Sequence, residues 1–172
     1  SQLMNKHTNI CLNVILDHSR HLLNRLHDNS IDVCFSYLAT NEISYKCIPY
    51  KTDEIIFVTN SQNIQFSNGI HNGEILHLPI IYSKFMPKSG FDWIHDIFPP
   101  HYVFQFTISV IKEIIPFLLQ YPYYAFLPRK LIEKELKDGL LIEIPLLDYH
   151  IPPLQSYIIM KSNAKYNPLD YF

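Results

Sequence analysis

TISVIKEIIPFLLQYPYYAFLPRKLIEKELKDGLLIEIPL, residues 107–146, contains four predicted elements in succession. Apolar residues recur at helical spacing from Ile108 to Leu119, which predicts an amphipathic helix. Pro122 ends this helix, because proline lacks the amide proton and disfavours helical backbone in the residue before it. The run 123–127 is apolar, rich in aromatic residues and too short for a helix, so it predicts a buried strand.

The second half of the same stretch repeats this alternation. Pro128 suits the first turn of a helix, and Glu133 and Lys137 lie four residues apart on its expected solvent side. Gly139 supplies the left-handed conformation that commonly ends a helix, and residues 140–146 return as a strand. Because a strand–helix–strand unit of this kind needs a parallel sheet covered by helices, the predicted fold class is α/β.

Three pieces of the chain together resemble the effector-binding domain of LysR-type transcriptional regulators. They are RKLIEKELKDGLL at 129–141 after the Leu-Pro that ends a strand, LHDNSIDVCF at 26–35, and the last strand at 152–161. Their order and spacing agree with that family over most of the chain. The resemblance implies a two-lobed, periplasmic-binding-protein-like fold with mixed sheets flanked by helices and a ligand cleft between the lobes. Lobe one is expected at 1–58 plus 128–172, and lobe two at 59–127.

The rest of the chain is predicted to follow the same α/β pattern. Before residue 107 we expect strands, helices and connecting segments as follows: strands 9–16, 31–36, 43–50, 54–60, 79–82 and 102–106; helices 17–29, 74–76 and 91–98; a turn at 51–53 and loops at 61–73 and 84–90.

Composition excludes several classes of protein. The chain is 48% hydrophobic and 17% charged, which favours a packed core over disorder. Net charge is −2 and no lysine or arginine cluster occurs, so no nucleic-acid surface is predicted. No apolar run approaches the roughly 20 residues of a membrane span. The three cysteines, Cys11, Cys34 and Cys47, lie in apolar strand-like runs, which favours reduced thiols in a cytoplasmic protein.

Candidate ligand-binding residues come from the rule that ligands of α/β sheets bind beyond the carboxyl ends of parallel strands. Each candidate follows a predicted strand or opens a predicted helix, where free backbone amides favour an anion. The candidates are His18, Ser19, Ser36, Tyr37, Ser83, Thr107 and Ser109. Each is also a typical cap or turn residue when taken alone. The family resemblance implies that small hydroxyl residues at about these places hold a small, often anionic, metabolite.

Motifs for enzymatic chemistry are not found. His18, His21 and His27 share a predicted helix, yet no cysteine or carboxylate completes a ligand set at zinc-like spacing. With four glycines in the chain there is no glycine-rich phosphate loop, and no nucleophile elbow or acid–base pair occurs. We therefore predict no enzyme activity, no metal and no cofactor.

The resulting hypothesis is a cytoplasmic domain that senses a small-molecule effector and forms a homodimer or tetramer of a LysR-type regulator. Such a domain would contact DNA only through a domain outside this chain, and no membrane partner is expected. Two alternatives share the architecture: a solute-binding protein, and an interaction module with a vestigial cleft. Tyr121 and Tyr123 favour the latter, since bulky residues replace the two-glycine turn of the family. A small α/β enzyme is a third class.

Overall fold

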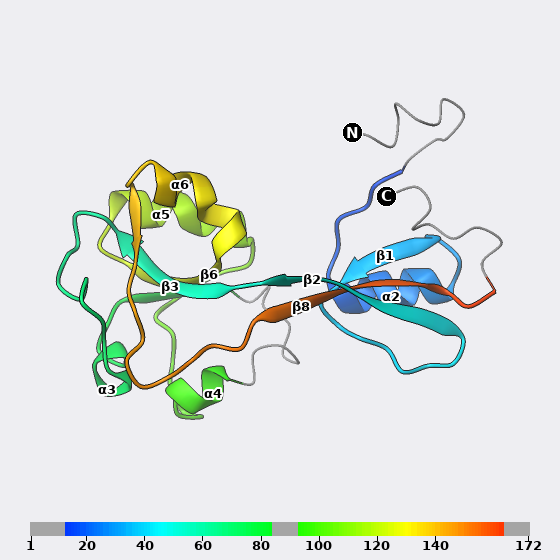
Figure 1. Ribbon diagram of the computed structural model, residues 1–172, viewed down its shortest axis with the longest axis horizontal. Coiled ribbons are helices and arrows are strands. Elements are labelled where there is room, and N and C mark those ends of the chain that lie inside the picture. The colour runs from blue at the N-terminus through cyan, green and yellow to red at the C-terminus, as the bar shows by residue number, and fades with distance from the viewer. Residues whose placement is uncertain (1–12, 84–92, 164–172) are drawn as a thin grey trace. The chain divides into compact units, whose positions relative to one another are not determined.

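Two compact units make up the protein (Figure 1). The computed structural model describes residues 13–83 and 93–163. Within these ranges the smaller unit contains 13–50 and 156–163, and the larger unit contains 51–83 and 93–155. The chain passes between the units twice, at Tyr50–Lys51 and at Gln155–Ser156.

The smaller unit is one helix on a three-stranded sheet. Helix α2 is Ser19–His27, and the sheet has the order β1-β8-β2, with β1 Val33–Ser36, β8 Leu154–Lys161 and β2 Tyr45–Asp53. β1 and β8 are antiparallel. Leu26 of α2 is fully buried against Cys34 of β1 and Ile159 of β8, as expected for the apolar side of an amphipathic helix.

The larger unit is built on a five-stranded mixed sheet. Its order is β5-β4-β6-β3-β7, with β3 Ile55–Asn60, β4 Ile80–Ser83, β5 Phe106–Ile108, β6 Tyr124–Pro128 and β7 Leu141–Glu143. β4 runs parallel to β5 and β6, whereas β3 is antiparallel to β6 and β7. β6 and β7 therefore point the same way with β3 between them, so the predicted strand–helix–strand unit is present in a mixed sheet.

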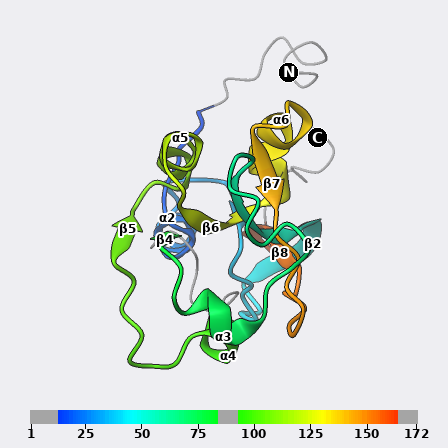
Figure 2. The same cartoon turned by 90° about the vertical axis from the view of Figure 1, so that its left-hand side faces the viewer.

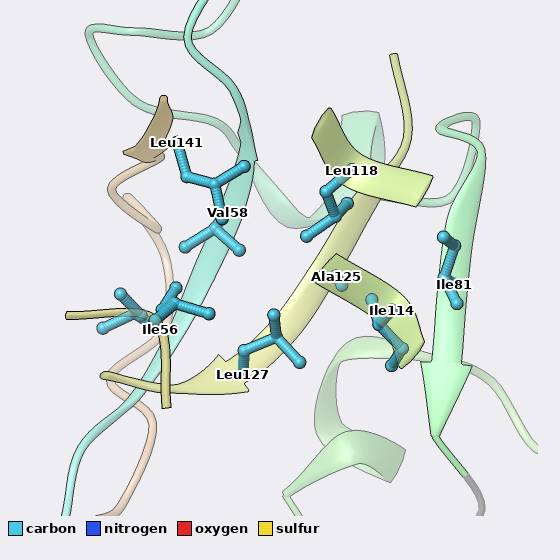
Figure 3. Close-up of a cluster of buried hydrophobic side chains, with 9 residues drawn as sticks. Ile56, Val58, Ile81, Ile114, Leu118, Ala125, Leu127 and Leu141 are labelled. Carbon is cyan, nitrogen blue, oxygen red and sulfur yellow. The ribbon is translucent and has the colours of Figure 1, made fainter. Parts of the chain in front are cut away.

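Short helices cover both faces of this sheet. Helices α5 and α6 lie on one face and α3 and α4 on the other (Figure 2). Their bounds are α3 Asn72–Ile75, α4 Ile94–Ile97, α5 Ile114–Gln120 and α6 Glu133–Lys137; the 3₁₀ turns η2 Ile111–Glu113 and η3 Arg129–Ile132 precede α5 and α6. Figure 3 shows Ile114 and Leu118 of α5 directed at Val58, Ala125 and Leu127 of the strands, which is the core of the unit.

Strands occupy two places where the sequence favoured other structure. A helix was predicted from residue 107, but Phe106–Ile108 is strand β5. Phe106 and Ile108 alternate with Thr107 and pack on the core while β5 pairs with β4, and this pairing outweighs the helical spacing. β2 also runs on through the predicted turn at 51–53 as far as Asp53. The predicted strand at 102–106 is replaced by irregular backbone up to residue 105.

Three predicted elements touch residues outside the described ranges. The strand at 9–16 is described from residue 13 onward, where the backbone has no regular structure. The loop at 84–90 lies wholly outside the description. The helix at 91–98 is described from residue 93 and contains α4.

The two units divide the chain at other residues than the predicted lobes. The predicted boundaries, 58/59 and 127/128, both fall inside the larger unit. The reason lies in strand pairing, because Val58 pairs with Ala125 and Ile55 with Pro128 in one continuous sheet. The predicted lobe boundaries stay a prediction.

Candidate functional site

Four of the seven candidate residues meet in the smaller unit. His18 immediately precedes α2 and Ser19 is its first residue, while Ser36 ends β1 and Tyr37 follows it. The Tyr37 amide donates a hydrogen bond of 3.3 Å to Oγ of Ser19. The carboxyl end of β1 therefore lies against the amino end of α2, although β1 is antiparallel to its neighbour β8.

Ser36 uses its hydroxyl inside the turn that follows β1. Its Oγ donates to the carbonyl oxygen of Leu38 at 3.0 Å and accepts from the Leu38 amide at 2.9 Å. Only 2% of Ser36 is exposed. The side chain thus fixes the backbone that carries Tyr37, and Ser19 holds the same turn from the helix.

A carboxylate also lies at this helix end. Oδ1 of Asp17 accepts hydrogen bonds from the His18 amide at 2.8 Å and interacts with Nδ1 of His21 at 2.9 Å; its Oδ2 accepts from Nε of Arg25 at 3.4 Å. The His18 amide, followed by His21, lowers the pKa of Asp17. An ionised Asp17 therefore already uses part of the positive potential that the amino end of α2 offers to an anion.

The other three candidates lie in the larger unit, on β4 and β5. Ser83 ends β4, Thr107 is the middle residue of β5, and Ser109 follows β5. Ser83 pairs with Ile108, so Ser83 and Ser109 lie at the same edge of the sheet, at the carboxyl ends of two parallel strands. Thr107 and Ser109 were expected to open a helix, which is wrong because the helical turns begin at Ile111.

Thr107 and Ser83 are not brought together. Phe106 and Ile108 pack on the core that contains Ile81, so Thr107 between them points to the opposite face of the sheet. Ser83 lies two residues after Ile81 and is buried, on the core side. Thr107 is exposed and on the other side.

Arg129 is a charged residue at this sheet edge that is not among the seven candidates. It directly follows β6, at the same carboxyl-end edge as Ser83, and applying the strand-end rule to β6 would have identified it. Its Nε donates to Glu54 and its Nη2 to Glu143, and its amide donates to the carbonyl oxygen of Glu54 at 2.8 Å. These bonds tie together the ends of β6 and β7 and the residue before β3.

The buried thiol of Cys34 in the smaller unit has low reactivity at neutral pH. Burial, with a smaller contribution from Cys47, raises the pKa of Cys34 to about 11. Because the thiolate is the reactive form, Cys34 is a poor nucleophile or metal ligand at neutral pH. Among the described residues there is no group of three or more histidine, cysteine or acidic residues arranged to hold a metal ion. Those residues also include no helix that is long and apolar enough to span a membrane.

Comparison with solved structures shows that the fold is a known one. An OxyR mutant from Corynebacterium glutamicum matches with a TM-score of 0.71 and 17% identity, covering 95% of this chain and 53% of that one. CrgA, a LysR-type transcriptional regulator from Neisseria meningitidis, matches with a TM-score of 0.72 and 10% identity. The match covers 94% of this chain and 55% of the CrgA chain. The BenM effector binding domain with its effector benzoate matches with a TM-score of 0.70 and 14% identity. The match covers 99% of this chain and 78% of the BenM chain.

The chain thus spans little more than half of the OxyR and CrgA chains. No curated protein matches it. The family model of the LysR substrate binding domain matches residues 1–169, nearly the whole chain. This match confirms the resemblance inferred from residues 26–35, 129–141 and 152–161. The chain belongs to the family of LysR substrate binding domains.

Proposed function

We propose that this chain senses a small-molecule effector for a cytoplasmic LysR-type transcription regulator. The observation that carries the proposal is the meeting of His18, Ser19, Ser36 and Tyr37, where the end of β1 lies against the start of α2. Ser19 and Ser36 also hold the local turn through their hydroxyl groups, so the proposal rests on the grouping of these polar residues and not on any one of them. Ser83 and Ser109 form a second polar strand end, in the larger unit.

The effector is proposed to be small and polar, with anions as the first class to test. Benzoate, the effector named for the BenM domain, is one such anion. Asp17 opposes a full negative charge at the start of α2, since its carboxylate accepts the His18 amide. Neutral hydrogen-bonding molecules of similar size therefore belong in the same screen.

A mechanism follows from the way in which the two units are connected. β2 and β8 each begin in one unit and end in the other. A ligand that binds one of two arrangements of the units more tightly would increase the population of that arrangement. β2 and β8 would then transmit the change between the units. In the proposed regulator the change would alter a homodimer or tetramer, and a DNA-binding domain outside this chain would read it. Sedimentation of the chain with and without ligand tests the assembly.

The test of the sensing role is a thermal-shift screen with small carboxylates, amino acids, inorganic anions and neutral polyols. A ligand at 100 times its dissociation constant stabilises the folded protein by roughly 2.7 kcal/mol, which gives a clear shift in Tm. We expect a hit that weakens in Ser19→Ala and stays unchanged in Ser44→Ala, an exposed turn serine. A ligand that stabilises both variants equally would place binding elsewhere. If no probe stabilises the folded protein, the interaction module becomes the better explanation.

A solute-binding protein of similar architecture is a second alternative. The match of the LysR substrate binding domain to residues 1–169 favours the regulator.

A further inference from the structure

Residues 144–153, which we name the strap, connect β7 to β8 and so precede one of the two passages between the units. Main-chain hydrogen bonds fix its first part to the larger unit. The Ile144 amide donates to the carbonyl oxygen of Phe57 at 2.8 Å. The Ile70 amide donates to the carbonyl oxygen of Pro145 at 2.9 Å, and the Leu147 amide donates to the carbonyl oxygen of Ile70 at 3.0 Å.

The second part of the strap is attached in a different way. From residue 148 to residue 153, the described structure has no main-chain to main-chain hydrogen bond that holds the strap to the unit. Instead Oδ1 of Asp148 meets Nδ1 of His71 at 2.9 Å, and Oδ2 of Asp148 accepts the Asn72 amide at 2.9 Å. Oη of Tyr149 donates to Oδ2 of Asp96 at 2.6 Å. The hydrogen bonds described for this part of the strap therefore all involve ionisable side chains.

We propose that residues 148–153 form a pH-responsive latch, held most firmly while His71 is an imidazolium and loosened when it becomes neutral. The imidazolium and the Asp148 carboxylate form an ion pair, whereas a neutral ring retains only the hydrogen bond. Loosening would free residues 148–153, whereas the strap up to Leu147 would stay fixed by its main-chain hydrogen bonds. The latch involves the strap alone and does not depend on the proposed effector.

The charged groups around His71 support the direction of the switch. Asp148, by its hydrogen bond and its charge, and then Glu74 raise the pKa of His71 above its ordinary value. The Asn72 amide, followed by His71, lowers the pKa of Asp148. The ion pair is therefore complete below the ordinary histidine value of about 6.5 and is lost as the pH rises through the raised pKa of His71. On the acid side it is lost as the pH falls through the lowered pKa of Asp148.

Amide hydrogen exchange of the whole chain, followed by NMR, tests the latch. The Asn72 amide reports on the Asp148 contact, and the Ile70 amide is the control, because its acceptor is the carbonyl of Pro145. After correction for intrinsic rates, we expect protection of Asn72 relative to Ile70 to fall by about two- to fivefold between pH 6 and pH 8. In the His71→Gln and Asp148→Asn variants this ratio should not change with pH. A ratio that is constant in the unaltered protein, or that still changes in His71→Gln, would overturn the proposal.

Discussion

Asn60 caps the carboxyl end of helix α5 from the end of a strand 58 residues earlier in the chain. Its Nδ2 donates to the carbonyl oxygens of Leu118 at 3.1 Å and Leu119 at 2.8 Å. Carbonyl groups in the last turn of a helix have no partner within the helix, so an external donor satisfies them. This contact couples β3 to the helix that covers the core of the larger unit.

Replacing Asn60 by aspartate tests this cap with little change in shape. The carboxylate offers no donor and faces the negative end of the helix dipole, so we expect about 1–2 kcal/mol less stability at pH 7. The deficit should shrink below pH 4, where the protonated carboxyl can donate again. Asn68→Asp is the control, because Asn68 is exposed and the substitution adds the same charge. Urea unfolding curves that are identical for the two variants would show that the cap contributes nothing.

Thr59 holds the turn that leads into β6. Its Oγ1 donates to the carbonyl oxygen of Tyr123 at 2.8 Å, and the residue is completely buried. The isosteric change Thr59→Val keeps the packing but removes the donor to that carbonyl and the acceptor of Asn63 Nδ2, which lies 3.3 Å from Oγ1. This loss should cost about 1–3 kcal/mol. Thr52→Val, on an exposed part of β2, should alter the free energy of unfolding by less than about 0.5 kcal/mol. Equal unfolding free energies for the two variants would contradict a role for this hydrogen bond.

The sequence predicted the elements whose spacing and packing agree. Leu22, Leu23 and Leu26 mark the inner face of α2, and all three pack where the pattern places them. The run 123–127 became β6 because it lies at the centre of the sheet and is buried on both faces. In both places local pattern and tertiary contact favour the same structure.

The errors arose where partners distant in the sequence decide the structure. Thr107 fits a helical pattern, and only the pairing of Phe106 with Ile81 on β4 makes it part of a strand. Lys51 and Asp53 look like turn residues, yet β2 continues through them, and Nε2 of Gln155 donates to the Lys51 carbonyl from 104 residues away. Such pairings cannot be read from a local window. Arg129 is a different case, because it directly follows the strand predicted at 123–127, and the strand-end rule applied there would have selected it.

Arg129 should contribute to stability in a way that depends on salt. Its guanidinium joins Glu54 and Glu143 at a partly exposed position, where each ion pair is worth roughly 0.5 kcal/mol or less after screening by solvent. We expect Arg129→Met to lower the free energy of unfolding by about 1 kcal/mol in dilute buffer and by clearly less in 1 M sodium chloride. Lys134→Met, on the exposed side of α6, is the control for loss of a positive charge. A deficit that salt leaves unchanged would mean that packing of the side chain, and not charge, is responsible.

Cys34 should resist alkylation until the smaller unit opens. It is 3% exposed, and burial raises its pKa to about 11, so few molecules carry the thiolate at pH 8. Iodoacetamide should therefore modify the less buried Cys47 before Cys34, and Cys34 only after urea is added; peptide mass spectrometry follows both residues. Rapid labelling of Cys34 in the folded protein would contradict the packing described for β1.

Gly69 allows the strap to lie against the larger unit, and its replacement is a direct test of that contact. A Cβ atom at this position would lie 2.6 Å from Cδ2 of Leu147, and its φ of +118° is strained for any other residue. We expect Gly69→Ala to lower the free energy of unfolding by about 2 kcal/mol. Gly73→Ala, with nothing within 4 Å of the added carbon, should be neutral or slightly stabilising. Adding Leu147→Ala to Gly69→Ala should recover the part of the loss that comes from the collision, whereas the backbone strain persists. If Gly69→Ala unfolds at the same urea concentration as Gly73→Ala, the strap does not pack on residue 69 as described.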